Sequence, residues 1–497
     1  MQAISSAVKD FLSKPKLLLI DGQWRAAVSG RTFATHNPAD GSELVQVAEA
    51  DAADVDLAVA AARKALASRE WGGLPAAERA RIVWRVGDLI ETYAAELAEL
   101  ECLDNGKPYA VALAADVKLA AEIFHYMSGW ATKLHGLTIP LSVPYTPGAE
   151  YHSYTRLEPV GVVGQIIPWN FPLLMAAWKL APALTTGCAV VLKVAEETPL
   201  SALRLGEILL EAGVPAGVVN ILPGFGETAG AALAAHPGVD KVAFTGSTEV
   251  GKMIVRAAAG NLKRLTLELG GKSPNIILKD ADLALAIPGA ANAIFFNHGQ
   301  CCCAGSRLYV AREVYDEVVA GISAIAGSIK LGPGLDPETE MGPLVSEMQQ
   351  QRVNHYLNIG REEGARALCG GQPLPGQGYF VEPTVLVDAR QDMRVVQEEI
   401  FGPVVVASAF DQVDDALLEQ ANDSIYGLAA GVWTRDVSLA HSLANRLQAG
   451  TVWVNCYNIF DAALPFGGYK QSGWGREMGA EVLKHYTETK AVTVRIA

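Results

Sequence analysis

The 497-residue sequence predicts an α/β protein built mainly on parallel sheets. From about residue 151 onward, short runs that are apolar on both faces alternate with amphipathic stretches of helical length. Strands of this kind are typical of parallel sheets, in which helices cover both faces. The chain is also too long for a single hydrophobic core, so two or three domains are expected.

The elements alternate regularly between residues 160 and 259. Strands are expected at 160–167 (VGVVGQII), 189–194 (AVVLKV), 217–222 (GVVNIL) and 241–244 (KVAF). Helices are expected at 173–186, 200–212, 228–235 and 249–259. Such βαβ units are almost always right-handed, so these strands should form one parallel sheet.

A second round of alternation follows. Residues 282–296 predict a helix interrupted at Pro288-Gly289, because proline breaks the hydrogen-bond ladder of a helix. Strand candidates at 307–310, 404–406 and 451–455 then suggest a second α/β domain. Two outlying segments, 152–157 and 491–496, are typical of edge strands. They either pair with another chain in an oligomer or lie at internal sheet edges.

Composition and charge narrow the class of protein. The net charge of −14 argues against nucleic acid or an anionic membrane as a partner, because both select basic surfaces. Seven cysteines, three of them contiguous, do not resemble a secreted disulfide framework, and no spacing suggests a metal site. The N-terminus lacks the pattern of a signal peptide. The longest apolar region, 171–192, contains Lys179 and Pro182 and suits a buried helix and strand better than a membrane span. We therefore expect a cytoplasmic protein without a metal.

The contiguous cysteines Cys301, Cys302 and Cys303 are candidates for a nucleophile. A cysteine is more often a small core residue, but these follow a helix and a glycine-flanked turn where backbone N–H groups can converge. An ordinary thiol has a pKa of about 8.5 and is mostly protonated at neutral pH, so a reactive one needs a helix end or a nearby charge. Adjacent side chains diverge, so only one is expected to face a pocket.

Two polar residues stand at strand ends. Glu268 follows the apolar run at 265–267 and precedes Gly270-Gly271. It is either a surface residue of an alternating strand or a general base facing a cleft. Asn170, in the sequence PWNFP, either caps the following helix or donates a hydrogen bond into a cleft.

A nucleotide site is suggested by the segment FTGSTEVG at 244–251, which joins a strand to a helix. Its glycine would let a dinucleotide approach the helix N-terminus, although the segment is not the common G-x-G-x-x-G fingerprint. Lys193 and Glu196 follow an earlier strand and either hold the adenosine ribose or are solvated.

Seven motifs occur together and in order: PWNFP, KVAE, FTGSTEVG, LELGGKSPN, GQCCCAGSR, EEIFGP and PFGG. With them, the chain from about residue 18 to its end resembles the NAD(P)-dependent aldehyde dehydrogenase superfamily. It is most similar to the non-acylating, broad-specificity group and to bacterial phenylacetaldehyde dehydrogenases. The resemblance implies a Rossmann-like NAD-binding domain (1–139 and 160–270), an α/β catalytic domain with the nucleophile (271–470) and a small β extension for oligomerisation (140–159 and 486–497). It implies a homotetramer, with a dimer as the alternative.

The resemblance also implies roles for individual residues. It places the nucleophile on Cys302, the general base on Glu268 and the oxyanion donor on Asn170, assisted by the backbone N–H of Cys302. Lys179 and Glu477 match polar residues near the base that could form a proton path. The implied NAD-binding residues are Ile167, Pro168, Trp169, Lys193, Glu196, Gly246, Ser247, Leu269, Gly270, Glu399 and Phe401. The implied substrate pocket comprises Phe171, Met175, Trp178, Phe296, Cys301, Cys303, Phe460 and Phe466.

The implied reaction is the oxidation of an aldehyde to a carboxylic acid through a thiohemiacetal and a thioester, which Glu268-activated water hydrolyses. A carboxylate at Glu196 would repel a 2′-phosphate, so NAD is expected. Aromatic pocket residues without an arginine predict an apolar aryl or alkyl aldehyde as substrate. The alternatives are a coenzyme-A-acylating dehydrogenase, a semialdehyde dehydrogenase, a cysteine hydrolase and a structural protein on this fold.

Overall fold

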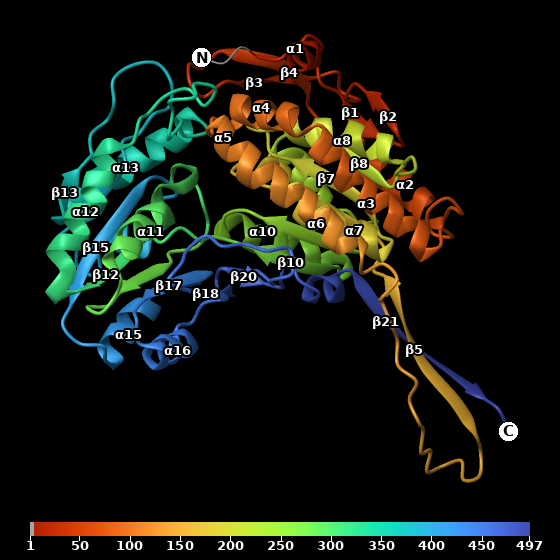
Figure 1. Ribbon diagram of the computed structural model, residues 1–497. Coiled ribbons are helices and arrows are strands. Elements are labelled where there is room, and N and C mark those ends of the chain that lie inside the picture. The colour runs from red at the N-terminus through yellow and green to blue at the C-terminus, as the bar shows by residue number, and fades with distance from the viewer. Residues whose placement is uncertain (1–3) are drawn as a thin grey trace.

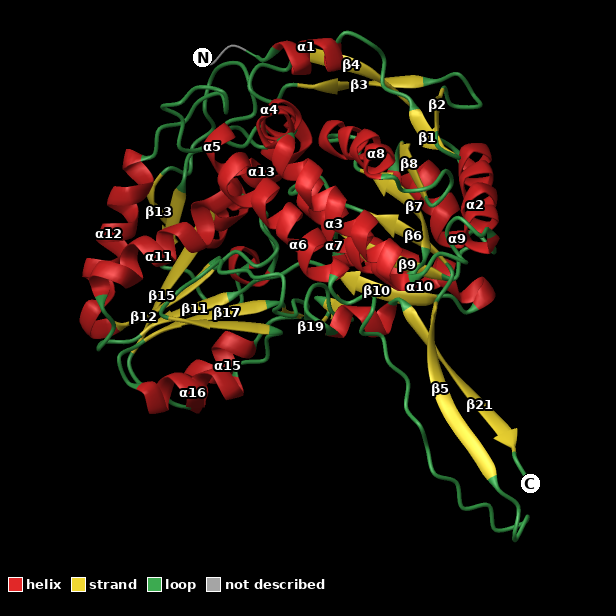
Figure 2. Cartoon of the chain, turned by 45° about the vertical axis from the view of Figure 1, so that its right-hand side comes forward, coloured by secondary structure: helices red, strands yellow, loops and turns green. Residues whose placement is uncertain are grey.

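Two sheets organise the computed structural model, which describes residues 4–497 (Figures 1 and 2). Their inner strands are parallel, so the predicted α/β class is confirmed. The strand order of the larger sheet is β2 (Gln23–Arg25), β1 (Leu18–Ile20), β8 (Val219–Pro223), β7 (Ala189–Val194), β6 (Val162–Ile166), β9 (Lys241–Thr245), β10 (Arg264–Glu268) and β20 (Gly473–Trp474).

The second sheet contains seven strands. Only the pair β13–β14 at its edge is antiparallel. The order is β13 (Arg366–Cys369), β14 (Thr384–Val387), β15 (Val404–Phe410), β12 (Arg307–Ala311), β11 (Pro274–Ile277), β17 (Ala429–Trp433) and β18 (Thr451–Val454). Short pairs are formed by β3 (Thr32–His36) with β4 (Glu43–Ala48) and by β16 (Tyr426–Gly427) with β19 (Tyr469–Lys470).

Helices cover the sheets on both sides (Figure 2). Those up to residue 258 are α1 (Ser6–Leu12), α2 (Ala52–Ala67), α3 (Ala76–Thr92), α4 (Ala94–Asn105), α5 (Tyr109–Val111), α6 (Lys118–Ser128), α7 (Pro172–Thr186), α8 (Leu200–Ala212), α9 (Ala231–Ala235) and α10 (Thr248–Ala258). Those that follow are α11 (Leu283–Phe295), α12 (Tyr315–Ser328), α13 (Glu347–Glu363), α14 (Arg394–Gln397), α15 (Asp415–Asn422) and α16 (Val437–Arg446).

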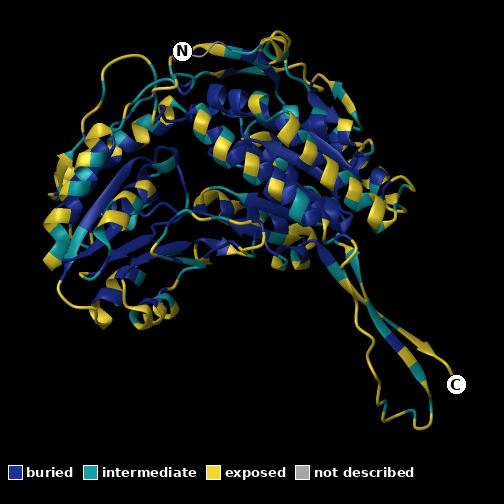
Figure 3. Ribbon diagram, in the orientation of Figure 1, coloured by how far each residue is buried: buried dark blue, intermediate teal, exposed yellow. Residues whose placement is uncertain are grey.

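The central strand β7 is buried on both faces, as its continuous apolar run predicts (Figure 3). Val190 and Leu192 belong to the core shared with α7 and α8, whereas Ala189 and Val191 belong to the core beneath α2. This division follows from the two-residue period of a strand. The apolar stretch 171–192 thus forms α7 and β7. Within residues 4–497, no helix is both long and apolar enough to cross a membrane.

The predicted interruption of the helix at Pro288-Gly289 is wrong, because α11 runs unbroken from Leu283 to Phe295. The N–H that Pro288 lacks would have bonded a carbonyl in the first turn, so a single ladder bond is lost. Gly289 permits close packing, since a Cβ there would lie 2.1 Å from Cη2 of Trp433. The predicted helix at 228–235, by contrast, is divided into a π-helical turn (Gly226–Gly230) and α9.

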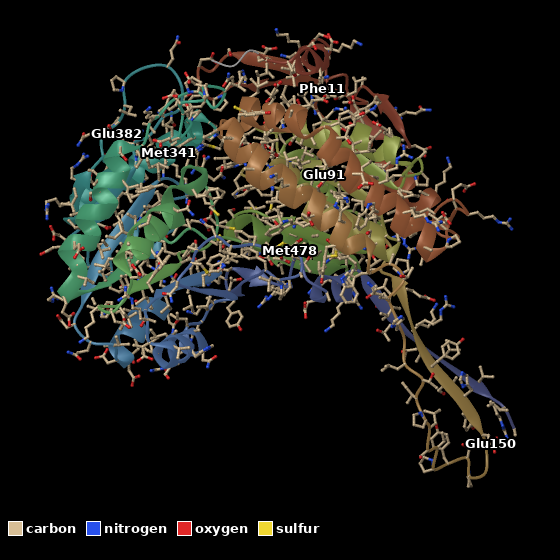
Figure 4. All side chains as sticks on the ribbon, in the orientation of Figure 1. Phe11, Glu91, Glu150, Met341, Glu382 and Met478 are labelled. Carbon is tan, nitrogen blue, oxygen red and sulfur yellow. The ribbon has the colours of Figure 1, made fainter. Side chains whose placement is uncertain are left out.

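The two predicted edge strands pair with each other. Strand β5 (Tyr151–Pro159) is antiparallel to β21 (Thr487–Arg495), and Tyr151 lies opposite Arg495. This hairpin projects from the body of the molecule (Figure 1), and Glu150 lies near its far end (Figure 4). Most of its residues are exposed or half-buried (Figure 3).

Candidate active site

A cavity of about 790 Å³ lies at the carboxyl ends of the parallel strands of the larger sheet. The chain proceeds from β6 through β7 to β8 on one side and returns to β9 on the other side of β6. The strand order therefore reverses beside β6, and open α/β sheets bind ligands at such a reversal. Residues that follow β6, β9 and β10 line the cavity, together with the cysteine segment from the other half of the chain.

A left-handed turn carries the cysteines to this cavity. After α11, Asn297, His298 and Gly299 all have positive φ angles, between 50° and 66°. Such conformations are uncommon for non-glycine residues and persist where the surroundings impose them. The carbonyl of Cys302 then packs against Gly271, where a Cβ would lie only 2.2 Å from that oxygen. The glycine pair of LELGGKSPN therefore allows the nucleophile segment its close approach.

The expectation that a single cysteine faces a pocket is wrong, because all three line the cavity. The N–H of Ala304 donates to the carbonyl of Cys301 at 3.1 Å, which closes a tight turn. This turn brings the sulfurs of Cys301 and Cys303 within 3.4 Å of each other. Those two residues are 7% and 1% exposed, whereas Cys302 is half-buried. Cys302 is therefore the thiol that a molecule in the cavity reaches most readily.

Hydrogen bonds among the three thiols shift their pKa values in opposite directions. Bonds from Cys302 and Cys303 lower the pKa of Cys301, and the bond to Cys301 raises the pKa of Cys302. Bonds to its two neighbours likewise raise the pKa of Cys303. Hydrogen bonds from the neighbouring thiols thus stabilise a thiolate on Cys301. These pKa shifts do not single out Cys302, which differs from the other two in being less buried.

Glu268 is the last residue of β10 and lines the cavity while only 4% exposed. The surface interpretation of this residue is therefore wrong. Neither of its carboxyl oxygens accepts a hydrogen bond within residues 4–497. Burial raises its pKa well above 4.5, and the charge of Glu477 adds to this effect, while Lys179 and Arg476 oppose it. A buried carboxyl of this kind can accept a proton near neutral pH.

Lys179 and Glu477 form a buried ion pair beside the base. Nζ of Lys179, on α7, lies 2.6 Å from Oε1 of Glu477. The second oxygen of Glu477 has no protein partner within residues 4–497. The structure thus brings both residues into the electrostatic environment of Glu268, and their role as a proton path stays a prediction.

Asn170 does not cap the helix, because Phe171 is the N-cap of α7 and Pro172 is its first residue. The Asn170 side chain is instead buried at the cavity, where its Nδ2 donates to the carbonyl of Gln300 at 3.0 Å. An amide nitrogen carries two hydrogens, so one remains for a ligand. Nδ2 of Asn297 donates in turn to the carbonyl of Asn170 at 3.0 Å, so two hydrogen bonds join the PWNFP loop to the cysteine turn.

The structure brings most of the predicted NAD-binding residues to one side of the cavity. Those in its wall are Pro168, Trp169, Gly246, Ser247, Leu269, Gly270, Glu399 and Phe401. Ser247 caps α10 by accepting from the N–H of Val250 at 3.2 Å, so a helix N-terminus borders the cavity. A helix N-terminus favours a phosphate group. The absence of a side chain at Gly246 keeps the turn accessible to a dinucleotide, and a Cβ there would lie 2.5 Å from the Phe244 ring. The residues present therefore fit NAD.

The side chain of Glu399 contacts the glycine pair Gly270-Gly271. Its Oε1 accepts from the N–H of Gly271 at 2.9 Å, and a Cβ at Gly270 would lie 2.5 Å from its Oε2. Burial raises the pKa of Glu399 to about 7. Its contact with a sugar of the cofactor stays a prediction.

Three predicted cofactor residues lie beside the cavity rather than in its wall. The N–H of Ile167 donates to the carbonyl of Lys193 at 3.1 Å. Nζ of Lys193 lies 2.7 Å from a carboxyl oxygen of Glu196. Lys193 is buried, so it is not a solvated surface lysine, and its contact with a ribose stays a prediction.

All eight predicted substrate residues line the cavity. The rings of Trp178 and Phe466 lie edge to face with centroids 5.4 Å apart, and Phe460 lies 5.6 Å from Phe466. Phe171 and Phe296 stack at 6.2 Å on the same cavity wall. The helical stripe that begins at Phe171 is therefore a wall of the cavity and not only core.

Sequence reasoning missed other parts of the wall. α6 and the turn before it contribute Asp116, Lys118, Leu119 and Glu122, and α13 contributes Gln349 and Arg352. Their local sequence carries no motif that predicts this placement. Arg352 donates to the carbonyl of Glu399 at 2.7 Å, so it belongs to the cofactor side. Within residues 4–497 it is the one arginine in the wall, and the aromatic side has none.

Comparisons with known proteins agree with this geometry. The model of the "Aldehyde dehydrogenase family" matches residues 24–492. "Putative aldehyde dehydrogenase DhaS" of Bacillus subtilis (strain 168) is 56% identical over 99% of this chain and 98% of its own. The mitochondrial aldehyde dehydrogenase of Homo sapiens is 53% identical over 96% of this chain and 92% of its own. The NAD⁺ complex of an aldehyde dehydrogenase from Bacillus cereus superposes with a TM-score of 0.97 at 53% identity and covers all of both chains.

Proposed function

The chain belongs to the aldehyde dehydrogenase family, and from this premise we propose that it oxidises an apolar aryl or alkyl aldehyde to the free carboxylic acid. It is an NAD-dependent aldehyde dehydrogenase, an oxidoreductase. The observation that carries the proposal is the position of Cys302, the least buried of the three adjacent thiols, in one cavity with the aromatic side chains and the predicted cofactor residues.

Cys302 and Asn170 form and stabilise the first adduct. The thiolate attacks the carbonyl carbon, and the oxygen of the tetrahedral product accepts hydrogen bonds from the Asn170 amide and the Cys302 N–H. Loss of one such donor typically costs about 3–4 kcal/mol of transition-state stabilisation. When bound, NAD supplies a nicotinamide ring that accepts the hydride.

Glu268 completes the reaction. Its carboxylate takes a proton from water, which attacks the thioester on Cys302 and releases the acid. Lys179 and Glu477 would then carry the proton away from the buried base. An intact base favours hydrolysis over transfer of the acyl group to coenzyme A, which is the alternative outcome.

The substrate class follows from the aromatic wall. Phe171, Trp178 and Phe466 offer apolar contact, and no arginine lines this side of the cavity to pair with a carboxylate. An arylalkyl aldehyde such as phenylacetaldehyde fits this chemistry better than a semialdehyde.

A panel of aldehydes, followed by NADH absorbance, tests the substrate. We expect a higher kcat/KM for phenylacetaldehyde than for succinic semialdehyde, because a carboxylate would lose its hydration against the aromatic side chains and would find no arginine there. The reverse order would contradict the apolar pocket. Product analysis in the presence of coenzyme A should detect free acid, and acyl-CoA would show an acylating enzyme instead.

Two variants test the catalytic roles. Cys302→Ala should abolish turnover because no covalent adduct forms, while Cys369→Ala, a half-buried thiol outside the cavity wall, is the matched control. Glu268→Gln should release about one NADH per active site in a burst and then stall at the acyl stage. Undiminished NADH formation by Cys302→Ala would disprove the mechanism.

The organisation of the chain is part of the proposal. Apart from the short edge strand β20, every strand of the larger sheet precedes β11, the first strand of the second sheet. This order supports an NAD-binding domain (1–139 and 160–270) and a catalytic domain (271–470). The projecting hairpin supports assembly through 140–159 and 486–497 into a homotetramer, or else a dimer. The three thiols of the site must stay reduced, which suits the cytoplasm.

A further inference from the structure

We propose that Lys107 is a positioning residue for the oxyanion site and that its buried ammonium holds the backbone from which the Asn170 side chain projects. The inference rests on the proposed function, because it assumes that Asn170 stabilises the adduct on Cys302. The juxtaposition that carries it is a fully buried cation in contact with the carbonyl of the predicted oxyanion donor.

Lys107 lies just beyond the end of α4, where Gly106 adopts a φ of 89° and terminates the helix. Its side chain is 0% exposed. Nζ donates to the carbonyl of Asn170 at 3.2 Å and lies 4.5 Å from the centroid of the Phe171 ring. It thus contacts both the predicted oxyanion donor and a wall residue of the substrate side.

Two carboxylates share this ammonium. Lys107 forms an ion pair with Asp116 and lies 3.7 Å from Oε2 of Glu101. Asp116 itself lines the cavity, and Oε1 of Glu101 accepts from the N–H of Leu173 at 2.6 Å, in the first turn of α7. Lys107 and Glu101 therefore connect the PWNFP loop to the first turn of α7, the helix that lines the substrate side.

The Asn170 carbonyl also accepts from two neutral amides, Nδ2 of Asn297 at 3.0 Å and Nδ2 of Asn105 at 3.5 Å. These donors fix the peptide, and the side chain then has only the Gln300 carbonyl as its own partner. Without Lys107, the Asn170 carbonyl loses its only charged donor and keeps neutral amide donors, so the peptide is held less firmly and the side-chain amide shifts from the direction of the oxyanion. Misplacement by about 1 Å can cost about 100-fold in rate.

Stability alone explains this cluster poorly. Burial of an ammonium and its partners is costly, and replacement of a buried ion pair by apolar residues is often neutral or stabilising. The ammonium at the Asn170 carbonyl is therefore better explained by catalysis. It positions the Asn170 amide and supplies positive potential near the oxygen on which negative charge develops.

The test uses Glu268→Gln as background, because that variant halts after one NADH per site. In it, Lys107→Met should slow the burst about 10–100-fold with phenylacetaldehyde, while the burst amplitude and the Kd for NAD stay unchanged. A merely structural role would lower the amplitude, as part of the protein misfolds, and leave the rate constant alone. Lys263→Met is the matched control, since Lys263 is also buried, donates to the carbonyls of Ala234 and His236, and lies outside the cavity wall.

Lys107→Met leaves Asp116 without its cation and could fail to fold. The variant Lys107→Met/Asp116→Asn removes both charges of the pair, and in the same background it should show the same slow burst. A burst as fast as that of Glu268→Gln alone, from either variant, would overturn the inference. Absence of a burst from Glu268→Gln itself would instead refute the proposed function.

Discussion

At the scale of single residues, burial sets the ionisation of the groups around the cavity. Glu268 and Glu399 both lie at the glycine pair, and burial raises both pKa values. Burial also lowers the pKa of His298 to about 3. That imidazole stays neutral, so its Nε2 accepts from the N–H of Gly342 at 3.1 Å and supports the cysteine turn.

The raised pKa of Glu268 predicts the pH dependence of turnover. Below this pKa the carboxyl is protonated and takes no proton from water, so hydrolysis is lost as the pH falls through it. Steady-state kcat at saturating NAD and aldehyde should therefore rise with pH through a value well above 4.5. The residual turnover of Glu268→Gln should lack this rise. A wild-type profile already flat just above pH 4.5 would contradict the assignment.

At the scale of elements, the hairpin of β5 and β21 is the part least covered by the rest of the chain. Leu137 extends it, since its carbonyl accepts from the N–H of Thr155 at 2.8 Å, and its side chain is 68% exposed. Val494 and Ile496 are 48% and 65% exposed. Exposed apolar residues on an edge strand favour pairing with another chain.

Charges on the hairpin should weaken assembly. If the hairpin mediates the proposed assembly, Val494→Glu/Ile496→Glu should shift the protein towards species of smaller mass, because carboxylates would lose hydration in an interface. Light scattering after size-exclusion chromatography measures the mass. Val437→Glu on α16, at a position 69% exposed, is the control and should keep the wild-type mass. An unchanged mass for the double variant would place the interface elsewhere.

At the scale of the whole molecule, the cavity is built from both halves of the chain. The larger sheet contributes the turns after β6, β9 and β10, while the cysteine segment, Glu399 and Phe401 come from beyond residue 270. A ligand that contacts both halves of the chain binds only where the folded protein brings them together. Such a ligand stabilises folding by mass action.

NAD should therefore raise the thermal stability of the protein. At a concentration of about 100 Kd the gain is about 2.7 kcal/mol, measurable as a higher Tm. NADP should give a smaller rise because of the carboxylate of Glu196. Gly246→Ala should abolish the NAD effect, since its Cβ would enter the turn beside Phe244. Gly327→Ala, a helical position with open space around it, should respond like the wild type.

The pattern of the sequence predicted the elements around the site closely, as β7 and α8 show by beginning and ending at the expected residues. Apolar runs and residues spaced at the helical period indicate which faces of an element are buried, and these patterns differ between strands and helices. They therefore predict where strands and helices form. The interruption expected at Pro288 was wrong because the N–H that proline lacks would have bonded only one carbonyl, in the first turn of α11. The close packing of Gly289 against Trp433 of β17 is a tertiary contact that the local sequence does not show.

The sequence by itself determined the α/β class, the family resemblance and the residue types that the chemistry needs, because these depend on local order and short motifs. Only the tertiary structure decided that Cys302 is the least buried of the three adjacent thiols, that β5 pairs with β21, and that Lys107 reaches Asn170 across 63 residues of sequence. The exposure, pKa and contacts of a residue depend on neighbours from elements distant in the sequence. A local sequence pattern carries no information about those neighbours.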